Sequence, residues 1–112
     1  MRTSMLEVSV PEAGDVSVTD DTLTAELSDG RTISVPLAWY PRLMHASEPE
    51  RANWELIGGG TGIHWPDLDE DISVEDLLAG RASGESQQSL QRWLEAKREG
   101  RSLEIHAREG AD

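Results

Sequence analysis

Apolar and polar residues alternate in three short stretches near the start of the chain, at 16–18, 23–27 and 33–35. A period of two places every second side chain on the same face of a strand, so each stretch predicts a strand with one apolar face. Ser28-Asp29-Gly30 separates the last two stretches, and Asp and Gly both tolerate the positive φ of a tight turn. The pattern therefore predicts an antiparallel meander.

The period lengthens to that of a helix over residues 37–44, where the apolar residues share one stripe. Pro41 lies inside this stripe, has no amide proton and disfavours a helical residue before it. We therefore predict a short turn over 37–40 and then a helix that begins near Pro41. The pair Ser47…Glu50 has the spacing of a capping box and predicts a brief helix over 48–53.

A second β region follows, in which Trp54 and Leu56 precede a glycine-rich loop over 58–62, and Ile63 and Trp65 follow it. This alternation predicts a hairpin whose two Trp side chains point into the core. A phosphate-binding loop leads into a helix and usually has a Lys nearby. Here a predicted strand follows the loop and no Lys lies within thirty residues, so we interpret the glycines as a hairpin loop.

Two more helices are predicted after an acidic loop. Ser73 is a good N-cap and Gly80 a natural C-terminal stop. A longer helix is predicted over 85–99, with one apolar stripe and Gly100 at its end.

Together these elements predict an α+β fold in a single domain over residues 14–99. The expected architecture is an antiparallel β-sheet, made of a meander plus a second hairpin, with short helices and a C-terminal helix packed on one face. Residues 1–13 are expected to be loose or an edge strand, and residues 100–112 a frayed polar tail.

Composition limits the chemistry further. The 112 residues suit one domain, and the absence of cysteine excludes disulfides, iron–sulfur clusters, thiolate zinc sites and cysteine nucleophiles. No apolar run approaches the roughly 20 residues of a membrane span, and the first residues lack the apolar stretch of a signal peptide. We therefore expect a cytoplasmic protein that needs no cofactor.

The charge is concentrated in one place. The chain has 22 acidic and 10 basic residues, a net charge of -12, and residues 66–80 contribute half of it without a single base. Nucleic acid is disfavoured as a direct ligand, because binding phosphates requires clustered Lys and Arg. The acidic segment is either a solvated surface, a site for a basic protein partner or a cation site. Its six acids are Asp67, Asp69, Glu70, Asp71, Glu75 and Asp76.

Two smaller patterns suggest chemistry. Asp67, Asp69 and Asp71 have the oxygen spacing that opens an EF-hand loop, but Ile72 and Leu78 stand where that loop needs Gly and Glu. Weak binding of a divalent cation stays open as an alternative.

His64 should lie on the open face of the hairpin, where it could form a general acid–base pair with Asp67 or Asp69, or serve only as a structural histidine. Trp39 and Tyr40 either pack in the core or anchor a partner.

The residues from Trp54 onward carry a long, specific pattern, formed by Trp54, Ile57-Gly58, Gly62-Ile63-His64-Trp65-Pro66, Leu68, Asp71-Ile72 and Leu77-Leu78. Over about residues 14–98 the chain resembles the bacterial domain-of-unknown-function family 2442. The resemblance implies a small α+β domain without an assigned activity. It also implies a gene beside that of a second small protein, in an arrangement similar to toxin–antitoxin pairs.

We therefore predict a non-catalytic acidic binding module that acts through a basic protein partner, antitoxin-like or regulatory. The first alternative is a metal-dependent enzyme or cation-binding domain built on His64 and the three aspartates of the EF-hand-like spacing. Others are a nucleic-acid mimic and a DNA-binding regulator that uses the helix over 81–101, with Arg81, Arg92, Lys97, Arg98 and Arg101. A homo-oligomer that pairs through the Thr- and Ser-rich face of the meander also stays open.

Overall fold

The computed structural model describes residues 10–110, and the side chains of residues 10–100. Its first sheet is the expected meander, formed by β1 (Ala13–Val18), β2 (Thr22–Leu27) and β3 (Thr32–Pro36) in that order. Leu23 pairs with Val35 across β2 and β3, so the apolar residues of neighbouring strands share a face. Gly30 occupies the predicted turn with a φ of 95°. β2 and β3 contain the predicted alternating stretches, whereas β1 begins three residues earlier than its stretch and has an irregular register between Ala13 and Asp15.

A second sheet contains the expected hairpin, β4 (Glu55–Ile57) and β5 (Gly62–Trp65), together with a third strand, β6 (Glu70–Ser73). The prediction of a loop throughout this acidic segment was wrong. Acidic residues disfavour strands, but cross-strand pairing overrides that preference here. Ile72 lies opposite Ile63 on the inner face, and Asp71 lies opposite His64 on the outer face.

Short helices connect the two sheets at one end. A 3₁₀ turn, η2 (Leu37–Trp39), leads into α1 (Pro41–Met44), which begins at Pro41 as predicted. Next comes α2 (Glu48–Ala52), where the Ser47–Glu50 capping box is fully formed. The proline and the capping box thus set both helix starts.

The glycine-rich loop is a second 3₁₀ turn, η3 (Gly58–Gly60), between β4 and β5. Gly60 has a φ of 102°, and a Cβ there would lie 2.7 Å from the Cβ of Glu12. The loop therefore needs glycine both for its backbone conformation and for close packing. This supports its interpretation as a hairpin loop.

The last two helices follow the second sheet. α3 (Val74–Ala79) begins at Ser73, whose hydroxyl accepts a hydrogen bond from the Asp76 amide, and ends at Gly80 with a φ of 72°. α4 (Gln87–Gly110) is longer than predicted, because the helix passes through Gly100 instead of ending there. One glycine costs a helix only about 1 kcal/mol, which good helix formers on both sides offset. The helix thus extends over residues 101–110, which the sequence assigned to a polar tail.

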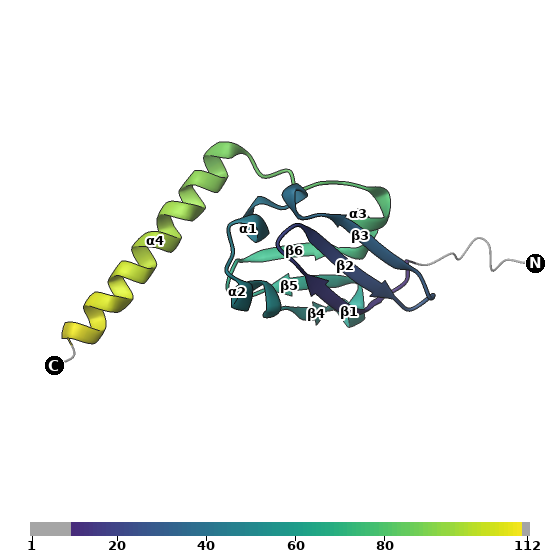
Figure 1. The fold of residues 1–112 in the computed structure, drawn as a ribbon, viewed down its shortest axis with the longest axis horizontal. Helices are drawn as coiled ribbons and strands as arrows, with labels where there is room; N and C mark the ends of the chain where they lie inside the picture. Colours follow the sequence, from purple (N-terminus) through teal and green to yellow (C-terminus); the bar gives the residue numbers. More distant parts are fainter. Residues whose placement is uncertain (1–9, 111–112) are drawn as a thin grey trace, which may run out of the picture.

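The two sheets are stacked and share one hydrophobic core (Figure 1). α4 lies beside α1 and α2 at one end of the stack and contributes Leu90 and Trp93 to the packing. Among residues 10–100 no polar or charged residue is fully buried. Within the described helices, none is both long and apolar enough to cross a membrane. The largest side chains with almost no exposure are Trp65, Leu23, Leu37, Leu43, Ile63, Leu68 and Val74.

The two hairpin tryptophans make different contributions to this core. Trp65 is fully buried and its indole N–H donates to the Arg51 carbonyl at 3.0 Å, whereas Trp54 is half-buried. We expect Trp65→Phe to lower the free energy of unfolding by about 2–3 kcal/mol, because it shortens a core side chain and leaves a carbonyl without its donor. Trp54→Phe should cost less than about 1 kcal/mol. Urea unfolding curves measure both, and equal losses would contradict this assignment.

Candidate functional site

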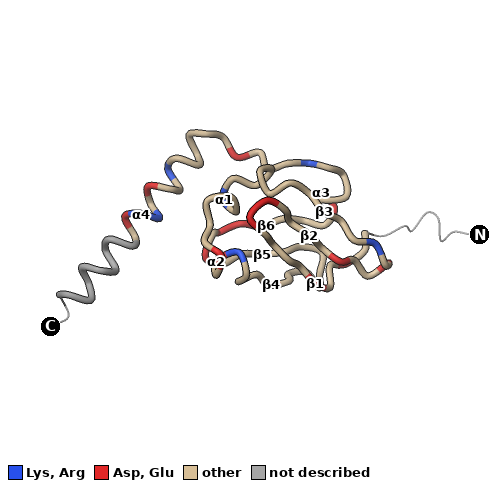
Figure 2. Tube along the Cα trace, in the orientation of Figure 1, with Lys and Arg blue, Asp and Glu red and all other residues tan. Residues whose placement is uncertain are grey.

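The six acids between residues 66 and 80 lie on β6, on the turn before it and at the start of α3. We call this surface the acidic edge; acidic positions gather there in Figure 2. The turn is anchored by Leu68, which is fully buried and whose amide donates to the Trp65 carbonyl at 3.1 Å. Asp67 and Asp69 flank Leu68 and are exposed, and Asp69 adopts a positive φ of 51°. One buried leucine therefore directs two carboxylates toward solvent.

His64 lies on the outer face of its sheet, as predicted, but its partner is different. Its Nδ1 is hydrogen-bonded to the carboxylate of Asp71, its cross-strand neighbour, and not to Asp67 or Asp69. This hydrogen bond raises the pKa of His64, and the charges of Asp71, Glu55 and Asp69 add to the effect. The pair thus favours a protonated imidazole, which neutralises one carboxylate of the acidic edge.

Two other carboxylates are held by neighbours in the chain. Asp67 accepts a hydrogen bond of 2.9 Å from the side-chain amide of Asn53, just after α2. Asp76 accepts one of 2.7 Å from Arg81, which lowers the pKa of the Asp76 carboxyl. Among the described side chains, the ion pairs do not involve Asp69, Glu70 or Glu75. Asp67 is likewise in none of these ion pairs, because its Asn53 partner is neutral, so these four acids have no cationic partner of their own.

Glu70 is the least exposed acid of this group. It pairs in register with the buried Trp65, so its side chain starts on the inner face of β6. Burial raises the pKa of Glu70 to about 7, and the negative charges of Glu85, Asp71 and Asp69 act in the same direction, while Arg42 opposes them. Glu70 is therefore a carboxyl that changes charge near neutral pH.

Arg42, on α1, organises the surroundings of Glu70. Its guanidinium forms a fork with the Glu85 carboxylate, with N–O distances of 2.7–3.0 Å, and also donates to the carbonyls of Leu68 and Asp69. The hydroxyl of Ser89 donates to the same Glu85 carboxylate at 2.9 Å. The sequence did not mark Arg42 as a site residue, because its contacts join segments far apart in the chain.

An open hollow of about 280 Å³ lies at this junction. Its lining includes four carboxyl groups and one guanidinium, and the residues are Arg42, Asp69, Glu70, Asp71, Ser83, Glu85 and Ser89. Arg42 is paired with Glu85 and His64 with Asp71, so the net negative charge of this oxygen-lined, electronegative hollow comes from Asp69 and from Glu70 when it is ionised. Such a depression is suited to a cationic group.

The amino-acid sequence matches one known protein family over most of the two-sheet domain. The family described as "Protein of unknown function (DUF2442)" matches residues 13–83. The chain belongs to this family. The matched residues include the whole acidic edge and end before α4.

Two solved structures are similar to this family 2442 domain. A crystal structure of a protein of unknown function from Rhodospirillum rubrum is 27% identical, with a TM-score of 0.60 over 70% of this chain and 98% of that chain. A solution structure of an uncharacterised protein from Chromobacterium violaceum is 20% identical, with a TM-score of 0.59 over 81% and 84%. The second likeness shows the fold alone. The comparison with curated proteins found no match.

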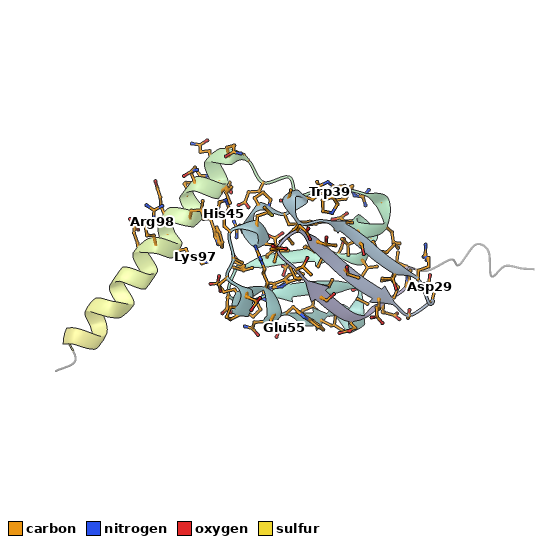
Figure 3. The ribbon with its side chains drawn as sticks, in the orientation of Figure 1. Asp29, Trp39, His45, Glu55, Lys97 and Arg98 are labelled. Carbon is orange, nitrogen blue, oxygen red and sulfur yellow. The ribbon has the colours of Figure 1, made fainter. Side chains whose placement is uncertain are left out.

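The other predicted site residues of this family 2442 domain lie apart from the acidic edge or inside the core. Tyr40 is buried, and its hydroxyl donates to the Arg81 carbonyl at 3.3 Å. Burial raises the pKa of Tyr40 to about 12. Because the Tyr40 side chain is buried, the interpretation of Tyr40 as a partner anchor is wrong, and its core interpretation holds. Trp39 is half-buried against the core and is labelled in Figure 3.

The aspartates do not form a metal site with His64. Among the described residues, no three His, Cys, Asp or Glu side chains come together in a way that would hold a metal ion. Asp69 and Asp71 line the same hollow, but Asp67 does not line it and bonds to Asn53, and the Asp71 carboxylate is paired with His64. The EF-hand-like spacing therefore does not produce a ligand set.

The raised pKa of Glu70 predicts a specific pH dependence of stability. Its carboxyl titrates near 7 in the folded protein, against an ordinary value of 4.5. Between these values the folded state binds more protons than the unfolded state, so stability decreases as the pH rises through this window. Glu70→Gln should remove that part of the decrease and stabilise the protein at pH 8 by about 1–2 kcal/mol, with allowance for solvent screening.

Thermal or urea unfolding between pH 5 and pH 8 measures this effect. Glu26→Gln on the exposed side of β2 is the matched control, and it should leave the pH profile unchanged. A Glu70→Gln profile that is parallel to that of the parent would contradict the assignment.

Because Arg42 binds Glu85 through a bidentate fork, we predict that a lysine of the same charge cannot replace it. Arg42→Lys keeps the charge but loses the planar fork and the bonds to two carbonyls, so we expect a loss of about 1–2 kcal/mol of stability. Arg31→Lys is the control, because the Arg31–Asp29 pair has side-chain exposures of 56% and 40%, and it should change stability by less than about 0.5 kcal/mol. Similar losses in the two variants, measured by urea unfolding, would disprove the role of the fork.

Proposed function

We propose that this family 2442 domain is a non-catalytic acidic binding module that acts through a basic protein partner, as an antitoxin-like or regulatory component. The observation that carries the proposal is the electronegative hollow beside exposed carboxylates on the acidic edge. A Lys or Arg side chain of a partner would meet oxygen atoms there from several directions. Charge-assisted hydrogen bonds to carboxylates are roughly twice as strong as neutral ones.

The net charge of -12 adds a long-range contribution. An acidic domain attracts a basic partner before contact, which speeds association at low salt. A nucleic-acid-binding toxin is a partner of this kind, because its binding surface must be basic. An acidic module that covers such a surface would block it.

A catalytic role has less support from the geometry. The imidazole best placed for proton transfer, that of His64, is held by Asp71 on the outer face of the sheet and does not line the hollow. General acid–base catalysis needs such a group within hydrogen-bond reach of a bound substrate. In the DNA-binding alternative, Arg81 is paired with Asp76 and is not a free cation; the side chain of Arg101 lies outside the described residues.

The test uses the product of the neighbouring gene, co-expressed with this chain and titrated against it at physiological salt. The triple variant Asp69→Asn, Glu70→Gln, Glu75→Gln replaces three acids of the acidic edge by amides and breaks none of the ion pairs among the described side chains. We expect it to weaken the complex by about tenfold or more, mainly through the association rate at low salt.

The matched control is the triple variant Asp15→Asn, Asp20→Asn, Glu26→Gln. It replaces the same number of acids by amides at exposed positions of the first sheet and its turn. We expect an affinity within about twofold of the parent, because these acids lie on the first sheet and its turn and do not line the hollow. The proposal fails if no complex forms at physiological salt, or if both triple variants weaken it equally.

A further inference from the structure

A basic pocket lies where α4 passes the end of α1. It has a volume of about 300 Å³ and is lined by His45, Leu94, Lys97 and Arg98. Figure 3 labels the three polar residues of this lining, His45, Lys97 and Arg98. No carboxylate lines it, although the chain as a whole is strongly acidic. This local reversal of charge needs a physical explanation.

The pocket is built from side chains that other residues hold in place. The Lys97 ammonium lies 2.8 Å from the Glu50 carboxylate and 5.0 Å from the centre of the Trp93 ring. Glu50 is itself fixed, because it closes the capping box of α2. An ammonium group has three donors, so the bond to Glu50 leaves donors for a ligand. Its fixed position lowers the entropy cost of binding.

The end of α1 would normally repel an anion, because the last carbonyls of a helix carry partial negative charge. Here the Arg51 side chain donates to the carbonyls of Leu43 and Met44 at 2.9 and 3.0 Å. These two acceptors are therefore satisfied beside His45, the C-cap of α1. The imidazole N–H of His45 can donate a hydrogen bond in either protonation state.

Arg98 supplies the planar fork. Its side chain is exposed, and none of the ion pairs among residues 10–100 involves it. A guanidinium can bind two oxygens of a phosphate at once through parallel hydrogen bonds. An ammonium group acts as a point charge and lacks this bidentate geometry. Leu94 adds an apolar wall next to these donors.

We propose that the basic pocket is an oxyanion site that takes the phosphate group of a small phosphate monoester. Its volume is at the lower end of ligand pockets, which suits one phosphate with a small organic group against Leu94. This site is separate from the hollow of the acidic edge, and it concerns a single phosphate, not the phosphate array of a nucleic acid. It does not depend on the proposed function.

The test titrates the full chain with phenyl phosphate, inorganic phosphate and benzoate at constant ionic strength, followed by amide chemical shifts in NMR. We expect saturable shifts at residue 45 and at residues 94–98, with phenyl phosphate binding more tightly than inorganic phosphate because its ring contacts Leu94. Benzoate, which has one negative charge and two oxygens against the three non-ester oxygens of phenyl phosphate, should bind more weakly than phenyl phosphate.

Arg98→Gln should weaken phenyl phosphate binding by about tenfold, because it removes one charge-assisted pair. Arg92→Gln is the matched control, since Arg92 is an exposed arginine of the same helix that does not line the pocket, and it should leave the affinity unchanged. The proposal is overturned if phosphate shifts do not saturate, if they spread over the whole surface, if benzoate binds as tightly as phenyl phosphate, or if the two variants weaken binding equally.

Discussion

One guanidinium connects the parts of this molecule that carry its candidate surfaces. Arg42 extends from α1 to the Glu85 carboxylate before α4, to two carbonyls of the turn before β6, and to the Trp93 ring at 5.1 Å. Its side chain is only 18% exposed. Because the solvent is largely excluded, a misplaced partner would leave a charge without compensation. The position of the acidic edge relative to α4 therefore depends on this single fork.

The elements that the sequence predicted correctly are those set by neighbours within a few residues. The alternation of residues 23–27, the capping box at Ser47 and the cap at Ser73 all act locally, and each formed as expected. β6 was missed because its stability comes from pairing with β5, which outweighs the low strand propensity of its acids. For the same reason His64 was given the wrong partner: Asp71 is opposite it only once β6 exists.

The family pattern and the α+β class were predictable, whereas the hollow was not. The acidity of residues 66–80 is visible in the sequence, but its distribution over the surface depends on tertiary contacts. Leu68 turns two aspartates outward, His64 and Arg81 compensate two carboxylates, and the inner face of β6 holds Glu70 partly out of water. What sequence shows as one charge run is therefore three kinds of carboxyl group with different protonation and availability.

The docking of α4 combines oriented charges with limited apolar burial: Leu90 is its one buried residue among those whose side chains are described, and Trp93 packs partly buried against the core. The Trp93 ring contacts the Arg42 and Lys97 cations at 5.1 and 5.0 Å, and each such contact contributes roughly 0.5–2 kcal/mol. The two cations are paired with Glu85 and Glu50, respectively. On the Arg42 side lies the electronegative hollow, and on the Lys97 side lies the basic pocket. The Trp93 ring thus contacts one cation beside each of two surfaces of opposite charge, so it adds to the Arg42–Glu85 fork in holding both surfaces in place relative to α4.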